Sequence, residues 1–137
     1  MLKPNTMDPE ASNKIRKVLV VDDNLLNRKL ACAILRNNEY DFDVAENGKI
    51  AYDLFVAGSY DIILMDIQMP IMNGIESSKM IRDFERKSNS ISSIPIIAVT
   101  TFTRDSDKQN CYDAEMNEVL GKPYKTDNLM EVIGRYI

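Results

Sequence analysis

Three short runs of apolar, mostly branched residues recur along the chain and constrain its fold more than any other feature. They occupy residues 18–21, 62–65 and 96–99. Continuous apolar runs of this length are typical of strands that are buried on both faces, as in a parallel sheet covered by helices. We therefore predict an α/β protein built on a parallel sheet.

The segments between these runs have the spacing of amphipathic helices. The helical segments are 26–34 behind a cap at Asp23 or Asn24, a stretch after Gly48, 75 to about 85, and 129–136. Residues 103–113 are nearly all polar, so a helix there would be loosely held.

Two further strands complete the predicted sheet. Residues 42–44 alternate in polarity, as an edge strand does, and 119–120 indicate a short last strand. Five strands alternating with five helices predict an open parallel sheet with helical crossovers.

The composition removes several classes of function. The chain has no histidine, which excludes a Ser-His-Asp triad, a histidine metal site and a phosphohistidine on this chain. With 17 basic and 21 acidic residues it has a net charge of −4, so we expect no nucleic-acid partner for this chain alone.

The remaining sequence features concern the compartment and the domain limits. Cys32 and Cys111 form no paired motif and are expected to be free, buried thiols in a reducing compartment. No apolar stretch approaches the roughly 18 residues that span a bilayer, so we expect a cytoplasmic chain without membrane contact. Residues 1–14 are expected to be a flexible tail, linker or tag remnant, and 15–137 one domain.

Polar side chains follow the predicted strands in a distinctive order. Asp22 and Asp23 follow the first apolar run, Asp66 the second, Thr100 the third, and Lys122 the short last strand. The carboxyl ends of parallel strands lie along one edge of a sheet, where open α/β folds bind ligands. These residues should therefore lie close together.

This grouping of charges indicates a particular chemistry. Neighbouring carboxylates repel one another unless a cation joins them, and Mg²⁺ prefers such oxygen ligands. A lysine and a hydroxyl beside them would hold an anionic oxygen group. An acidic pair after a strand is often only a helix cap or a solvated turn, but the whole pattern favours a phosphoryl-transfer site.

Residues 16–137 resemble response-regulator receiver domains, the phosphoacceptor modules of two-component signalling. The motifs are Val-Val-Asp-Asp-Asn at 20–24, Ala-Glu-Asn-Gly at 45–48, Met-Asp-Ile-Gln-Met-Pro at 65–70, Ile-Ala-Val-Thr at 97–100 and Leu-Gly-Lys-Pro at 120–123. The third motif is most similar to receivers of hybrid sensor histidine kinases. The resemblance implies a flavodoxin-like (βα)5 three-layer sandwich with strand order 2-1-3-4-5.

The resemblance also implies the roles of the acidic residues. Asp66 would accept a phosphoryl group from a phosphohistidine on a partner and would lose it slowly by self-catalysed hydrolysis. Asp23, Asp66 and the Gln68 backbone carbonyl would bind Mg²⁺, or Mn²⁺ as a substitute, and Asp22 would act through a bound water.

Further roles follow at the edge of the implied site. Lys122 and Thr100 would contact the phosphoryl oxygens, and Pro123 matches the family's cis proline. Phe102 and Gln68 lie at the rim, where residues tune phosphoryl hydrolysis.

The chain departs from the family pattern at two places that matter here. Val119 stands where many receivers have an aromatic switch residue, which puts the usual coupling of Thr100 to that residue in doubt. Glu115 stands where glycine is usual, so we expect the turn there to adopt another conformation.

The implied partner is a histidine kinase or a histidine phosphotransfer protein, and a phosphorylation-dependent dimer is a further expectation. The chain would be free-standing or the cytoplasmic part of a membrane-bound hybrid kinase. The alternative to a phosphoacceptor is a degenerate receiver that acts as a phosphorylation-independent interaction module. Such receivers usually lose an acidic residue or the lysine, whereas this chain keeps all three aspartates and Lys122. A haloacid-dehalogenase-type phosphatase is disfavoured because it expects Asp-x-Asp where this chain has Asp22, Asp23 and Asn24.

Overall fold

The computed structural model describes residues 15–137, and the predicted tail of residues 1–14 lies outside this range. Its centre is a sheet of five parallel strands in the order β2-β1-β3-β4-β5, which confirms the predicted topology. The strands are β1 (Lys17–Val21), β2 (Asp41–Ala45), β3 (Ile62–Asp66), β4 (Ile96–Thr100) and β5 (Glu118–Gly121).

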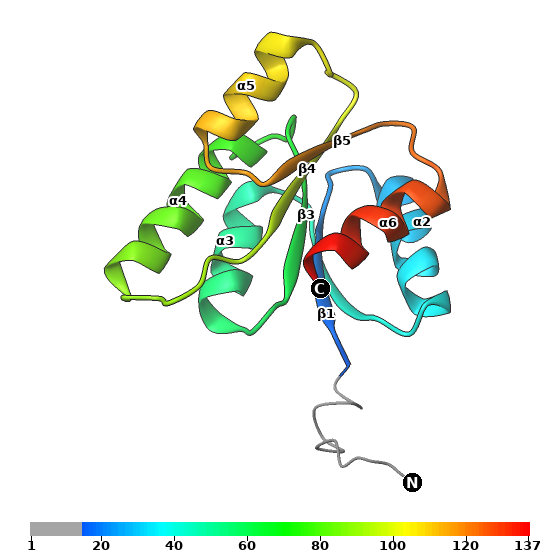
Figure 1. Cartoon of the computed structure of the whole chain (residues 1–137), viewed down its shortest axis with the longest axis horizontal. Coiled ribbons are helices and arrows are strands. Elements are labelled where there is room, and N and C mark those ends of the chain that lie inside the picture. Colours follow the sequence, from blue (N-terminus) through cyan, green and yellow to red (C-terminus); the bar gives the residue numbers. More distant parts are fainter. Residues whose placement is uncertain (1–14) are drawn as a thin grey trace, which may run out of the picture.

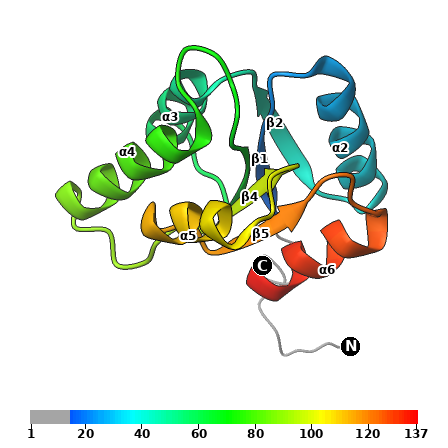
Figure 2. The same cartoon turned by 90° about the horizontal axis from the view of Figure 1, so that it is seen from above.

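Four helices connect successive strands and a fifth follows β5, and together they cover both faces of the sheet (Figure 1). They are α2 (Leu25–Asn37), α3 (Gly48–Ala57), α4 (Gly74–Lys87), α5 (Asp105–Asp113) and α6 (Thr126–Tyr136). Seen from above in Figure 2, α2 and α6 lie on one side of the sheet and α3, α4 and α5 on the other. None of the helices within residues 15–137 has both the length and the apolar character of a membrane-spanning segment.

The three apolar runs form β1, β3 and β4, the central strands. Every residue of β3 and β4 is buried, because helices pack on both faces. Alternate side chains enter two separate cores. Leu35 of α2 and Leu129 of α6 pack with one set of strand residues, and Ile81 of α4 packs with the other.

Asparagine side chains fix where three helices begin. The Asn24, Asn47 and Asn73 side chains each accept a hydrogen bond from a backbone N–H in the first turn of α2, α3 and α4. Such caps satisfy donors that have no partner within the helix. The structure thus selects Asn24 over Asp23 as the cap of α2.

Helix α5 is the least anchored helix, as its polar sequence predicts. Cys111 is its only buried residue. The turn after it contains Glu115 with a φ of 64°, in the left-handed region that glycine favours. The expectation that this turn would adopt another conformation is therefore wrong. The Glu115 side chain forms an ion pair with Arg86, and the Glu115 carbonyl accepts a hydrogen bond from Arg82.

Arg82 ties α4 to the strands at the amino-terminal end of the sheet. It is 4% exposed, and its Nη1 lies 2.8 Å from the Glu85 Oε1. Its Nη2 donates to the Asn117 side-chain oxygen, which also accepts from the Ile96 backbone. The other Glu85 oxygen accepts from the Ile94 N–H. The buried pair is thus hydrogen-bonded on both partners, which offsets the cost of burying its charges.

Replacing Arg82 by alanine should lower the free energy of unfolding by about 3–5 kcal/mol, because Glu85 would remain as a buried carboxylate without its counter-charge. Urea denaturation measures this change. The matched control is Arg86→Ala, which removes an arginine of the same helix from exposed ion pairs and should lower the free energy of unfolding far less. Equal losses in the two variants would contradict the assigned role of burial.

Candidate functional site

The predicted site residues lie at the carboxyl ends of the strands. Asp22 follows β1, Asp66 ends β3, Thr100 ends β4 and Lys122 follows β5. The parallel register aligns these ends, since Asp66 is opposite Val99 and Thr100 is opposite Gly121. The Lys122 backbone N–H also donates to the Thr100 carbonyl at 2.8 Å. Residues a hundred positions apart in sequence are brought to one edge of the sheet.

The Lys122 ammonium group lies between two of the carboxylates. Its Nζ is 2.8 Å from the Asp22 Oδ2 and 3.5 Å from the Asp66 Oδ1. Both aspartates are buried, each with 7% of its surface exposed. The second Asp22 oxygen accepts a hydrogen bond from the Asn24 N–H at 2.9 Å. Lys122 is therefore held by charge and is placed to meet an anionic group at this edge.

Asp66 has an unusual acidity. Burial, the largest influence, raises its pKa to about 6, while the neighbouring Lys122 lowers it and the Asp22 and Asp23 carboxylates raise it. The positive charge of Lys122 thus only partly offsets the desolvation of this carboxylate. A perturbed acid at a strand end is typical of a functional site.

The three aspartates could share a cation. Asp22, Asp23 and Asp66 each offer a carboxylate oxygen, and these oxygens lie within 4.8 Å of one another. Asp23 is exposed, whereas the other two are buried, so the cluster opens to solvent on one side. Oxygen donors without nitrogen or sulfur suit a hard divalent ion such as Mg²⁺.

The loop after β3 approaches the Asp66 backbone closely because Gly74 begins α4. A Cβ atom at Gly74 would lie 2.2 Å from the Asp66 carbonyl oxygen, so no larger side chain fits there without movement. The Gly74 N–H donates to the Ile67 carbonyl. Gln68, predicted to offer its carbonyl, is an exposed residue of this loop.

Thr100 and Phe102 lie beside the carboxylates. Thr100 is 3% exposed, and its hydroxyl accepts a hydrogen bond from the Phe102 N–H at 3.0 Å. Both line a small pocket of about 170 Å³ together with Gln68. The described contacts do not join the Thr100 hydroxyl to the carboxylates. Val119 on β5 is partly buried and packs against the core on the α3–α5 side.

Two other features complete the site. The Lys122–Pro123 peptide bond is cis, as the resemblance implies. Arg28, in the first turns of α2, donates to the Asp22 carbonyl at 2.7 Å and is a residue that the sequence reasoning missed. Its only signal in the sequence is a basic residue near the start of a helix, where the helix dipole disfavours positive charge.

The raised pKa of Asp66 gives a pH-dependent prediction. The folded state binds this proton more tightly than the unfolded chain, so the stability that the protonated group contributes is lost as the pH rises from about 4 to 6. Asp66→Asn should therefore raise the free energy of unfolding by about 2 kcal/mol near pH 7 without divalent ions, and should change it little below about pH 4.

Urea denaturation at the two pH values in a chelating buffer measures this difference. Asp53→Asn, at an exposed position of α3, is the matched control and should show no such pH dependence. A variant of Asp66 that is less stable than the original chain near neutral pH would refute the assigned desolvation.

Comparison with known proteins gives consistent matches. The response regulator receiver domain family matches residues 18–134. The chain is 43% identical over 135 residues to hybrid signal transduction histidine kinase B of Dictyostelium discoideum, covering 92% of this chain and 7% of that protein. It is 38% identical to hybrid signal transduction histidine kinase K of the same organism, covering 85% of this chain and 10% of that protein. The chain thus spans a small part of these relatives.

Two solved structures extend the comparison. One is the co-crystal structure of the Saccharomyces cerevisiae histidine phosphotransfer signaling protein Ypd1 and the receiver domain of its downstream response regulator Ssk1. It matches with a TM-score of 0.85 and 30% identity, covering 89% of this chain and 88% of that chain. The other is the receiver domain of a sensor histidine kinase of Pseudomonas aeruginosa with a magnesium ion in its active site cleft. It matches with a TM-score of 0.80 and 32% identity, covering 90% and 98%.

Proposed function

This chain belongs to the response regulator receiver domain family, and from that membership we propose that it is the phosphoacceptor of a two-component phosphorelay. The observation that carries the proposal is the position of Asp66. It is a buried carboxylate at a strand end, with the Lys122 ammonium 3.5 Å away and two further carboxylates close by. A nucleophilic carboxylate beside a fixed cation is suited to accept a phosphoryl group.

In the proposed reaction an Asp66 carboxylate oxygen attacks the phosphorus atom of a phosphohistidine on the partner. The new O–P bond forms as the P–N bond breaks, and the electron pair of that bond stays on the partner's imidazole. Lys122 would neutralise the phosphoryl oxygens, and the Thr100 hydroxyl would donate a hydrogen bond to one of them. Hydrolysis of the acyl phosphate would later restore Asp66.

The proposed metal is Mg²⁺, with Mn²⁺ as a substitute. Asp23, Asp66 and the Gln68 backbone carbonyl would hold it directly, and Asp22 would do so through a water molecule. The oxygen-only donor set supports this assignment, as does the magnesium ion in the Pseudomonas receiver domain. When bound, such an ion compensates the negative charge that gathers as the phosphoryl group arrives.

The proposed response to phosphorylation begins at Thr100. A phosphoryl group on Asp66 would attract the hydrogen of the Thr100 hydroxyl, and rotation of Thr100 toward it would shift or break the bond that the hydroxyl oxygen now accepts from the Phe102 N–H. The weakly anchored α5 begins shortly after, so a change at Thr100 can reach it at small cost. Val119 has no aromatic ring that could follow a movement of Thr100. We therefore expect such a movement to reach α5 through the Phe102 backbone, which is hydrogen-bonded to the Thr100 hydroxyl. Phe102 and Gln68 at the rim would tune the lifetime of the phosphoryl group.

The proposed partner is a histidine phosphotransfer protein or a histidine kinase. The matched yeast structure contains a receiver domain together with a histidine phosphotransfer protein, which supports the first. A cytoplasmic location, either alone or within a hybrid kinase, belongs to the same proposal and is supported by the two buried free thiols. Phosphorylation-dependent dimerisation is its least supported part.

Incubation with Mg²⁺ and acetyl phosphate should add one phosphoryl group to the chain, measured as a mass increase on the intact protein. Asp66→Asn should abolish the modification, whereas the exposed Asp53→Asn should leave it unchanged. Sedimentation of the modified sample then tests dimerisation.

Chelation of the metal should suppress the modification, and Lys122→Ala should slow it by about tenfold or more, because a charged hydrogen-bonding group contributes at least about 1.4 kcal/mol at such a site. Modification of the Asp66 variant would overturn the proposed acceptor. Unmodified protein that still binds a phosphotransfer partner would favour the phosphorylation-independent interaction module.

A further inference from the structure

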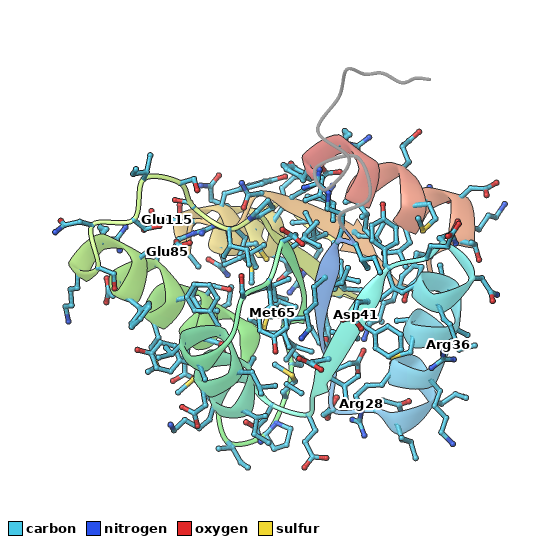
Figure 3. The ribbon with its side chains drawn as sticks, turned by 90° about the horizontal axis from the view of Figure 1, so that it is seen from below. Arg28, Arg36, Asp41, Met65, Glu85 and Glu115 are labelled. Atoms are coloured by element: carbon cyan, nitrogen blue, oxygen red, sulfur yellow. The ribbon has the colours of Figure 1, made fainter. Side chains whose placement is uncertain are left out.

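A groove of about 390 Å³ runs between α2 and the edge strand β2. It is separate from the pocket that Thr100 and Phe102 line. The side chains that line it are either apolar or basic, and within the described part of the chain no carboxylate lines it. In Figure 3, Arg28 and Arg36 lie on α2, beside the edge strand that contains Asp41.

The apolar part of the groove is accessible to a partner. Phe42 and Val44 face α2 because side chains alternate along a strand, while Asp43 faces the other side and bonds Tyr60. Val44 is 43% exposed, and Leu25 on the opposite wall is 57% exposed. Strand β2 has a neighbour on one side only, so this apolar surface lies at the open edge of the sheet.

The basic part of the groove has spare positive charge. Arg28 already donates a hydrogen bond to the Asp22 carbonyl, and its Nη2 lies 4.0 Å from the Glu46 Oε2. Lys29 and Arg36, in contrast, form no ion pair with any residue that the structure describes, and Arg36 lies over the Phe42 ring at 5.3 Å. Two cations without an ion-pair partner among the described residues therefore line the same groove as exposed apolar side chains.

We propose that this α2–β2 groove binds an acidic segment of a partner protein that carries large apolar side chains. Its carboxylates would pair with Lys29 and Arg36, and an apolar side chain would lie between Leu25 and Val44. A nucleic acid would satisfy the cations but has no aliphatic side chain for the apolar wall. The positive charge therefore selects an acidic partner, and the apolar wall selects a polypeptide.

The dimensions of the groove set the length of that segment. Leu25 and Arg36 lie on one stripe of α2, eleven residues and thus about 16 Å apart. An extended peptide of about five residues spans this distance. None of the residues proposed to take part in phosphoryl transfer lines the groove, and Arg28, which does line it, only donates to the Asp22 backbone carbonyl. This inference can therefore fail while the proposed function holds, and the reverse.

The test uses three labelled probes on the full chain: a short peptide alternating glutamate and leucine, its lysine and leucine counterpart, and a single-stranded oligonucleotide of similar length. Fluorescence polarisation measures binding, and amide NMR shifts on the original chain locate it. We expect only the acidic peptide to bind and its shifts to map to Lys29, Arg36 and Val44. Higher salt should weaken this binding.

Matched charge-reversal variants test the electrostatic part. Lys29→Glu with Arg36→Glu should weaken binding by about tenfold, as expected for two lost and reversed surface pairs. The control pair Lys79→Glu with Lys108→Glu changes the net charge equally at exposed positions of α4 and α5, and should change affinity by less than about twofold. Unchanged phosphorylation by acetyl phosphate would show that both double variants keep the fold.

Several outcomes would overturn the proposal. They are an equal loss of affinity in the control pair, oligonucleotide binding as tight as that of the acidic peptide, or NMR shifts that map elsewhere. Absence of any shift at about millimolar peptide would do the same. A peptide with serine in place of leucine that binds equally well would refute the apolar part.

Discussion

Lys122 makes the contact on which the carboxyl edge of the sheet depends. Its ammonium group lies 2.8 Å from one buried aspartate and 3.5 Å from another, at the ends of two adjacent strands. Without this charge, the parallel pairing of β1 and β3 would place Asp22 and Asp66 together with nothing to offset their repulsion. Lys122, which follows β5, therefore supplies the positive charge that offsets the repulsion between the carboxylates at the ends of β1 and β3.

The two ends of the sheet handle buried charge differently. At the amino-terminal end, Arg82 and Glu85 are matched one to one, and their remaining polar atoms bond the backbone or Asn117. At the carboxyl end, one ammonium contacts two of three clustered carboxylates, and burial raises the pKa of Asp66 to about 6. The charges of Arg82 and Glu85 are neutralised within the fold. The excess negative charge at the carboxyl end can instead be neutralised by a bound cation.

The helices likewise differ in how firmly they are held. Leu35 and Leu129 bury α2 and α6 in one core, while α5 contributes only Cys111 to the other. The proposed signal therefore starts at a rigid strand end and reaches the helix with the fewest buried contacts. The α2–β2 groove lies on a firmly packed helix instead, which suits a preformed binding surface.

The sequence by itself determined the central strands, the helix periods and the order of Asp22, Asp66, Thr100 and Lys122, because apolar runs and strand ends are local features. Only the tertiary structure decided which atoms meet: the position of Lys122 between two aspartates, the bond from Arg28 to the Asp22 carbonyl, and the basic groove beside β2. It also decided that the Glu115 turn keeps a left-handed conformation. These features depend on contacts between residues that are far apart in the chain. Packing of the whole fold sets the distances and the burial of these residues, and no local sequence pattern encodes them.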